Sequence, residues 1–327
     1  VLRDDFMKDV AAGIDQLATL TGDGGPAIAV GAPTKDNGNI FNSVFVLDGG
    51  KQIARFDKVN LPNYGVFDDK RNFTPGEMPG PIMLRGLKIG FPICEDIWEP
   101  DVVECLEESG ADLIIAMNAS PFDSKKPERR MQNVIARSVE TGLPIIYVNM
   151  IGGQDELVYD GSSFAINTGG KLACYAPSFS ESVLVVTAQK SMGALTLTGQ
   201  LSPPDSDLTA LYRGLCLGLR DYVQKNGFPN VVLGLSGGID SALVATIAVD
   251  ALGPDAVNAV MMPSAYTSKE SLDDAKKLAS NLGIRLDTIS ITPAMTALDD
   301  MLGDQFAGTK LGVAEENIQS RIRGIIL

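Results

Sequence analysis

The sequence predicts an α/β protein with two domains, and three observations support this fold class. Between about residues 27 and 180, strand-like runs are mixed with stretches of helical spacing. A segment rich in Ser, Thr, Gly and Pro follows, and beyond it helix and strand patterns alternate as in a doubly wound parallel sheet. We therefore predict a layered α/β domain over 1–190, a linker over 191–206, and part of a doubly wound domain over 207–327.

The elements of the first domain are predicted from short apolar runs separated by turns. Asp48-Gly49-Gly50 is a hairpin signal between two such runs. Helical spacing that stops at Gly110 or Gly142 predicts helices between buried strands. The predicted strands cover 43–47, 52–56, 87–93, 112–117 and 143–148, and the predicted helices cover 102–108 and 128–140.

The second domain is predicted from strict alternation of helix and strand patterns. Thr267 with Glu270 forms a capping-box pattern at the start of one helix, and Gly283 follows its end. The predicted helices cover 207–225, 240–252 and 268–281, and the predicted strands cover 231–235, 257–262 and 286–291.

Composition excludes several classes of function. The chain has 327 residues and a net charge of −14, which argues against general affinity for nucleic acid or anionic membranes. No apolar run is long enough to span a membrane, and no charged start followed by an apolar core and a cleavage site supports secretion, so we expect neither. The four cysteines form no CxxC pair, which indicates reduced thiols in the cytoplasm. The absence of histidine excludes a Ser-His-Asp triad, a Cys-His pair and a histidine-ligated metal.

The segment Leu233–Leu243 carries the strongest signal for phosphate chemistry. A buried strand passes through glycines into an apolar helix, so the backbone can approach a phosphate and the helix N-terminus offers N–H donors. Asp240 is a candidate ligand for Mg²⁺ bridging phosphate oxygens. The segment resembles the SGGxDS loop of ATP pyrophosphatases, which cleave ATP to AMP and pyrophosphate. The alternative is a glycine turn that only leads into a helix.

That resemblance implies an ATP site. Met262, at the end of the next strand, is expected near the adenine, although a core position is equally plausible for it. The residues implied to hold ATP phosphates and Mg²⁺ are Gly234, Ser236, Gly237, Gly238, Asp240 and Ser241.

A second chemical signal is Cys94, at the end of a predicted buried strand, with Lys58 upstream. A buried core thiol is the alternative for Cys94 taken alone. The surrounding segments resemble the nitrilase (carbon–nitrogen hydrolase) superfamily, an α-β-β-α sandwich whose Glu, Lys and Cys triad needs no histidine. They are Phe56–Phe67, Gly90–Trp98, Asn118–Phe122, Tyr147–Asn149 and Gly152–Gly161.

The resemblance implies that Cys94 attacks an amide carbon and forms a thioester, with Lys58 beside the thiol and the oxyanion. The backbone N–H of Glu95 would complete the oxyanion hole. Tyr64, Phe67, Glu95 and Ser120 would shape a glutamine pocket, although loop packing also explains Tyr64 and Phe67. The general-base glutamate of the family lies upstream of the lysine. No glutamate precedes Glu77, so we expect that residue before the start of this sequence.

The two domains in this order resemble the glutamine-dependent NAD synthetases, through phrases such as LPNYGVFDD, GGQDELVYDG, LGLSGGIDSAL and ENIQSRIRG. The resemblance implies glutamine, ATP and deamido-NAD as substrates, an adenylated nicotinate carboxylate, an ammonia channel and a homo-oligomer. Asn317, Arg321 and Arg323 would bind ATP or deamido-NAD, but a solvated helix face or a subunit contact explains them equally well.

Two alternatives stay open from the sequence. One is another amidotransferase that couples a nitrilase-like domain to an ATP-pyrophosphatase domain and uses a different acceptor. The other is an inactive module that binds nucleotide or assembles into oligomers. Formation of a glutamyl thioester or of AMP would distinguish an enzyme from a binding module.

Overall fold

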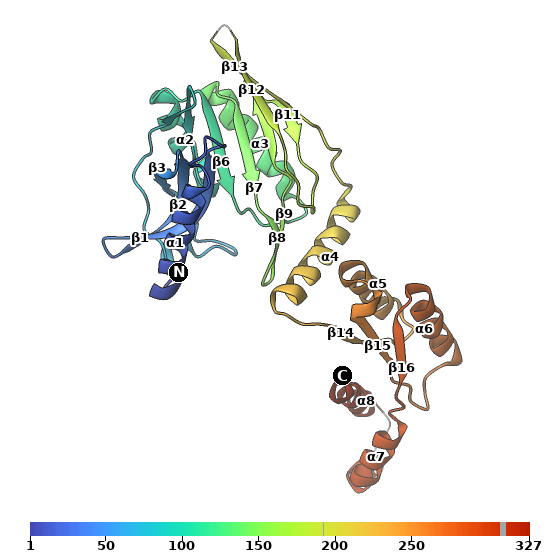
Figure 1. Ribbon diagram of the computed structural model, residues 1–327. Helices are drawn as coiled ribbons and strands as arrows, with labels where there is room; N and C mark the ends of the chain where they lie inside the picture. Colours follow the sequence, from blue (N-terminus) through green and yellow to red (C-terminus); the bar gives the residue numbers. More distant parts are fainter. Residues whose placement is uncertain (192, 308–311) are drawn as a thin grey trace. The chain divides into compact units, whose positions relative to one another are not determined.

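The computed structural model describes residues 1–191, 193–307 and 312–327. The chain divides into two compact units, which are described separately (Figure 1). The first unit comprises Val1–Gly152 and Tyr159–Ala210, and the second comprises Gly153–Val158 and Leu211–Leu327. Among the helices that the structure describes, none combines the length and apolar character needed to cross a membrane.

The first unit is an α-β-β-α sandwich, as the resemblance implied (Figure 1). One sheet is antiparallel, with the order β1-β2-β3; the other has six strands in the order β11-β10-β7-β6-β5-β4, of which β5, β6 and β7 run parallel. The strands are β1 (Ile28–Asp36), β2 (Asn39–Asp48), β3 (Lys51–Asp57), β4 (Ile82–Leu84), β5 (Leu87–Gly90), β6 (Leu113–Asn118), β7 (Ile145–Asn149), β10 (Phe164–Asn167) and β11 (Lys171–Tyr175). The helices are α1 (Asp4–Thr19), α2 (Pro100–Glu108) and α3 (Lys126–Thr141).

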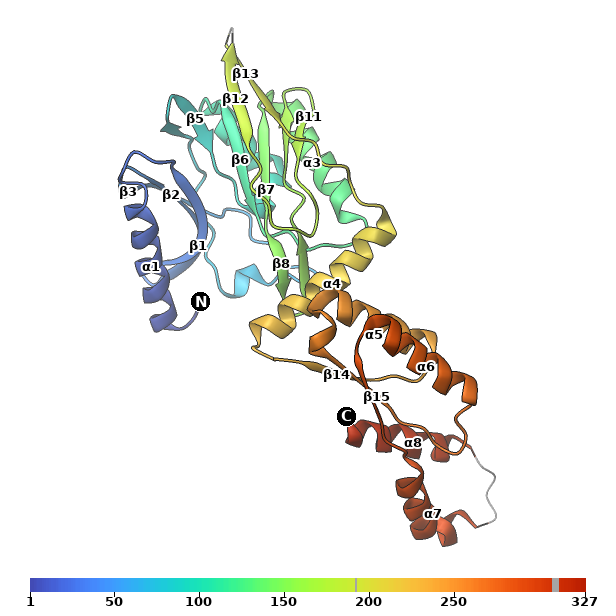
Figure 2. The ribbon, with the colours of Figure 1, turned by 45° about the vertical axis from the view of Figure 1, so that its right-hand side comes forward.

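Alternate side chains of β2 face two different layers of the sandwich. Val44 and Val46 face the six-stranded sheet, where they join a core with Ile89 and Leu113. The alternate residues Phe45 and Leu47 pack with Ile14 and Ala18 of α1, the helix that covers this sheet in Figure 2. Helices α2 and α3 cover the outer face of the six-stranded sheet through a third cluster; its fully buried members include Val102, Leu106, Val134, Ile145 and Tyr147.

Part of the predicted linker is folded. β12 (Val186–Ser191) and β13 (Ala194–Gly199) form an antiparallel hairpin, so the linker interpretation of residues 194–199 is wrong. The alternation Ala-Leu-Thr-Leu-Thr places Leu197 in the core at 1% exposure, while the threonines that suggested a loop occupy the opposite face. A second hairpin, β8 (Ile151–Gln154) with β9 (Leu157–Asp160), was not predicted.

The second unit contains a parallel sheet in the order β14-β15-β16, as expected of part of a doubly wound domain. Both faces of this sheet are covered. Ala259 and Met261 of β15 pack with α5 and α6, whereas Val260 and the next residue after the strand, Met262, pack with Ile291 and Ile322. The elements are α4 (Asp207–Lys225), β14 (Val231–Gly234), α5 (Ile239–Leu252), β15 (Val257–Met261), α6 (Lys269–Leu282), β16 (Arg285–Thr288), α7 (Thr292–Phe306) and α8 (Val313–Ile326).

The start of α6 differs from the prediction. Ser268, not Thr267, is the N-cap, and its side chain accepts the backbone N–H of Ser271. Thr267 instead accepts the backbone N–H of Ser264 in the preceding turn. The predicted end at Gly283 is confirmed by its left-handed conformation, with φ of 69°.

Candidate amide-hydrolysis and nucleotide sites

Cys94 lies at a sharp change of direction after β5. Ile93 still bridges Met117 of β6, and Cys94 then begins a short 3₁₀ helix over Cys94–Ile97. Its φ of +51° is a left-handed conformation that a non-glycine residue adopts only when its surroundings impose it. The bridge before Cys94 and the 3₁₀ helix that starts at it therefore fix the thiol at the carboxyl end of β5.

Asp96 ties this turn to the segment that carries Lys58. One carboxylate oxygen accepts the backbone N–H groups of Val59 and Asn60, at 3.1 and 2.7 Å. The other accepts the N–H of Ile93 at 2.9 Å. Burial raises the pKa of Asp96 to about 6, although the three N–H donors favour the charged form. Asp96 was not identified from the sequence.

Lys58 and Cys94 line the same cavity, which has a volume of about 590 Å³. The Lys58 ammonium is 3% exposed and lies 2.5 Å from the carboxylate of Asp69. Phe67 and Asp69 line the cavity as well. The Lys58 and Cys94 segments therefore lie at one cavity, and Asp69 is the partner that holds the lysine.

The electrostatics of the cavity follow from burial and two cations. Burial raises the pKa of the Cys94 thiol, and the positive charge of Lys58 opposes this shift. Lys126, the first residue of α3, contributes a second positive charge near the thiol. Its ammonium lies 5.2 Å from the ring centroid of Phe67, and burial lowers its pKa. The sequence reasoning missed Lys126, although it closely follows the Asn118–Phe122 motif.

The predicted glutamine-pocket residues are brought together only in part. The Tyr64 hydroxyl donates to Glu95 at 2.7 Å, and its ring meets that of Phe67 edge-on. Burial raises the pKa of Tyr64, with the Glu95 carboxylate adding to the shift. Ser120 is 1% exposed and lies behind the cavity wall, directly after the lining residue Ala119. Its role as a direct glutamine ligand stays a prediction.

The phosphate-loop segment forms a compact turn between β14 and α5. The hydroxyls of Ser236 and Ser241 lie 2.9 Å apart, and Ser236 Oγ accepts the backbone N–H of Gly238. Ser241 Oγ accepts the N–H of Ser236 and donates to the carbonyl of Gly238. Gly237 has φ of +86°, and a side chain there would collide with the backbone of Ser271. Glycine is required at this position by both conformation and space.

A cavity of about 380 Å³ opens beside this loop. Its lining includes Gly234, Ser236, Met262 and Arg323, and the Arg323 Nε donates to the Met262 carbonyl at 3.3 Å. Four residues predicted to bind ATP or deamido-NAD thus lie together: Gly234 at the end of β14, Ser236 in the loop, Met262 directly after β15, and Arg323 of α8. Asn317 and Arg321, also on α8, are exposed and do not line this cavity.

A magnesium site made by protein side chains alone is not found: within 1–191, 193–307 and 312–327, no cluster of three or more metal-ligating side chains occurs. Asp240 is exposed in the first turn of α5 and offers one carboxylate. This donor set fits Mg²⁺, because that ion commonly binds one or two carboxylates together with water and substrate phosphates.

With this geometry in place, the first unit can be assigned by comparison. The family model for carbon–nitrogen hydrolase matches residues 10–196. The chain belongs to the carbon–nitrogen hydrolase family. Beyond the carbon–nitrogen hydrolase part, the family model for NAD synthase matches residues 211–327.

Relatives of this carbon–nitrogen hydrolase carry both parts. The glutamine-dependent NAD(+) synthetase of Rhodobacter capsulatus is 45% identical over 100% of the chain, and that of Aquifex aeolicus is 40% identical over 100%. The chain spans 59% and 63% of their lengths. The solved glutamine-dependent NAD⁺ synthetase from Acinetobacter baumannii, in complex with ADP, superposes with a TM-score of 0.93 at 37% identity, covering 99% of this chain and 61% of its own.

Proposed function

We propose that this chain carries the glutaminase site and part of the synthetase site of a glutamine-dependent NAD synthetase. The observation that carries the proposal is the joining, in one chain, of the Cys94–Lys58 cavity to the phosphate loop at Ser236–Ser241. The Cys94–Lys58 cavity suits hydrolysis of an amide, and the phosphate loop suits binding of a nucleoside triphosphate. The similarity to synthetases over the full length of this chain supports the pairing.

At the first site, the Cys94 sulfur attacks the side-chain amide carbon of glutamine. The C–N bond breaks, ammonia leaves, and water hydrolyses the resulting thioester to glutamate and free thiol. Lys58 and the Glu95 backbone N–H stabilise the oxyanion, and Lys126 stabilises the thiolate and pairs with the substrate carboxylate. Glu95, oriented by Tyr64, pairs with the substrate α-ammonium.

The buried thiol needs a base, because burial disfavours its ionised form. Asp69 is engaged with Lys58, so its role is to hold that lysine in the cavity. The general-base glutamate implied by the family resemblance stays a prediction, since no glutamate precedes Glu77.

At the second site, the proposed substrates are ATP and deamido-NAD. The loop residues Gly234, Ser236, Gly237, Gly238 and Ser241 surround the phosphates, Met262 contacts the adenine, and Asp240 holds Mg²⁺. When bound, that ion supplies charge neutralisation at the phosphates. Arg323 offers a guanidinium beside the loop, and Asn317 and Arg321 lie on the same helix for substrate further along.

The nicotinate carboxylate attacks the α-phosphate of ATP and pyrophosphate leaves, and ammonia from the first site then displaces AMP from the adenylate to give NAD. Local delivery through a channel raises the effective concentration of ammonia, most of which is ammonium at neutral pH. The proposal includes a homo-oligomeric, cytoplasmic enzyme. The free state of Cys94, Cys105, Cys174 and Cys216 agrees with a reducing compartment.

The test measures NAD and AMP formation from ATP and deamido-NAD by the complete gene product, with either glutamine or ammonium as the nitrogen source. We expect both sources to support synthesis. Cys94→Ala should reduce the glutamine-driven rate by at least about 1,000-fold, as expected for loss of a nucleophile, and leave the ammonium-driven rate within about twofold. Cys105→Ala is the matched control and should leave both rates unchanged. Equal loss of both rates in Cys94→Ala would contradict the assignment of Cys94 to a separate glutaminase site.

A further inference from the structure

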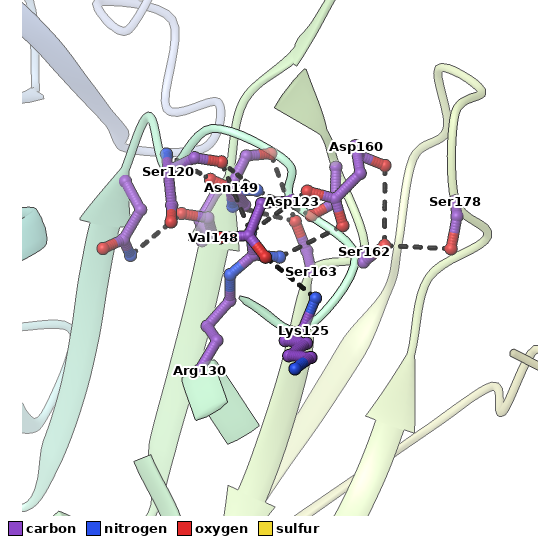
Figure 3. A network of polar contacts seen from close by, with 12 residues as sticks. Ser120, Asp123, Lys125, Arg130, Val148, Asn149, Asp160, Ser162, Ser163 and Ser178 are labelled. Atoms are coloured by element: carbon purple, nitrogen blue, oxygen red, sulfur yellow. Dashed lines mark hydrogen bonds and ion pairs between the residues drawn. The ribbon is translucent and has the colours of Figure 1, made fainter. Parts of the chain in front are cut away.

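The wall of the Cys94 cavity includes a short loop that is fixed from behind. Asn118 and Ala119 line the cavity, and Ser120 follows them at 1% exposure. The Ser120 N–H donates to the Asn149 side chain at 2.9 Å, and the Ser120 carbonyl accepts from Arg130 Nη2 at 3.3 Å (Figure 3). Both backbone polar groups of Ser120 are therefore held by side chains.

Arg130 is itself fixed by a buried ion pair. It donates from Nη1 and Nη2 to the two carboxylate oxygens of Asp160, each at 3.1 Å, and the two side chains are 1% and 2% exposed (Figure 3). Arg130 comes from α3 and Asp160 from the end of β9. The Asn149 amide completes the network by donating to the Gly161 carbonyl at 2.9 Å. The pair thus connects a helix, a hairpin and the cavity wall.

Stability alone does not account for this pair. Transfer of two charges out of water is costly, so apolar side chains of similar size are often as good or better for folding. What the pair offers is direction: the planar guanidinium presents its N–H groups at fixed angles, so that one edge meets Asp160 while Nη2 also reaches Ser120. A lysine would supply the charge without that fork.

We propose that Arg130 and Asp160 are positioning residues for the amide substrate, because they set the place of the Asn118–Ser120 wall relative to Cys94. Neither residue lines the cavity, and the two side chains are buried against each other at 1% and 2% exposure, so they do not reach the substrate. They act through the Ser120 backbone. This inference rests on the proposed glutaminase activity and extends it to residues outside the cavity.

The test uses the complete gene product with Arg130→Lys, Asp160→Asn and the double variant Arg130→Met/Asp160→Leu, which removes both charges. We expect each to raise the KM for glutamine about tenfold through displacement of the wall, with a smaller change in kcat. Ammonium-driven NAD synthesis should stay within about twofold. Arg137→Met is the matched control: Arg137 lies on the same helix, pairs with Glu140 and should leave KM unchanged.

A second measurement is independent of glutamine hydrolysis. Iodoacetamide is a small amide that alkylates cysteine thiolates with loss of iodide. Mass spectrometry of the Cys94 peptide measures the alkylation rate as a function of iodoacetamide concentration. We expect the half-saturating concentration to rise in the three variants while the limiting rate, set by the thiol, stays the same. For each variant, the alkylation rate is divided by the fraction of folded protein in which Cys94 reacts, so that unfolded protein does not affect the comparison.

A merely structural pair would lower the melting temperature but leave KM and half-saturation unchanged in the folded fraction, and that result in any variant would overturn the inference. If the single variants do not fold, the uncharged double variant decides. An unsubstituted protein that is alkylated at Cys94 but hydrolyses no glutamine would refute the proposed function instead, and the iodoacetamide measurement would still decide this inference.

Discussion

At the residue scale, Asp96 joins the Cys94 turn to the Lys58 segment, Asp69 pairs with the Lys58 ammonium, and Lys126 adds a positive charge near the thiol. Cys94 and Lys58 stood out because their segments match a known motif and because the lack of histidine leaves few other activators. Asp96, Asp69 and Lys126 were missed, because their importance depends on burial and on partners from distant segments. A carboxylate that accepts three backbone N–H groups looks like any other aspartate in the sequence.

Asp96 gives a prediction about stability against pH. Its folded pKa of about 6 lies above the ordinary 3.8, so the folded state binds more protons between these values and stability falls as pH rises. We expect this group to lower the free energy of unfolding by about 2 kcal/mol between pH 4 and pH 7. Urea unfolding at both pH values, in the original protein and in Asp96→Asn, isolates the contribution.

Asp96→Asn removes the titration and keeps one oxygen that accepts the N–H groups of Val59 and Asn60. The difference in stability between the two proteins should therefore move in favour of the variant as pH rises. If the stability difference stays constant with pH, or changes in favour of the original protein as pH rises, the pKa of Asp96 is not raised in the folded state.

At the element scale, the spacing of apolar residues and the position of turn-forming residues predicted most of the helices and strands. Apolar strands separated by helices of the right length indicated parallel pairing, and glycine marked the end of α6. The β12–β13 hairpin was predicted as linker, and the N-cap of α6 was placed at Thr267 instead of Ser268. Both errors arise because Ser and Thr occur equally well in loops, at helix caps and on strand faces. Only the packing of Leu197 and the donor at Ser271 decide between those roles.

The phosphate loop gives a prediction at this scale. Gly237→Ala forces a left-handed conformation on a side chain that collides with the Ser271 backbone, so we expect a loss of about 1–3 kcal/mol from the conformation alone and loss of ATP binding. Isothermal titration with ATP and thermal unfolding measure both effects. Gly303→Ala, in the last turn of α7 with open space around it, is the matched control and should change stability by less than about 1 kcal/mol. Unchanged ATP affinity in Gly237→Ala would contradict the proposed role of this loop in phosphate binding.

At the scale of the whole molecule, the order of the two domains was predicted from the sequence, and the two family models match in that order. Release of ammonia at the first site and its use at the second remain a proposal. The sequence did not predict the β8–β9 hairpin, whose ends belong to the first unit and whose tip, residues 153–158, packs with α4 in the second. Such an arrangement depends on tertiary contacts between segments far apart in sequence, such as Gly153 with Asp221.

The central claim is that the nitrogen released at Cys94 becomes the amide nitrogen of the product. The direct measurement supplies glutamine labelled with ¹⁵N at its side-chain amide, together with ATP, deamido-NAD and excess unlabelled ammonium, and determines the mass of the NAD formed. We predict mainly ¹⁵N-labelled NAD, because the proposed function delivers the ammonia released at Cys94 to the second site without mixing with the solution. The label should be absent with Cys94→Ala, although unlabelled NAD still forms. Unlabelled NAD from the unsubstituted protein would contradict the account.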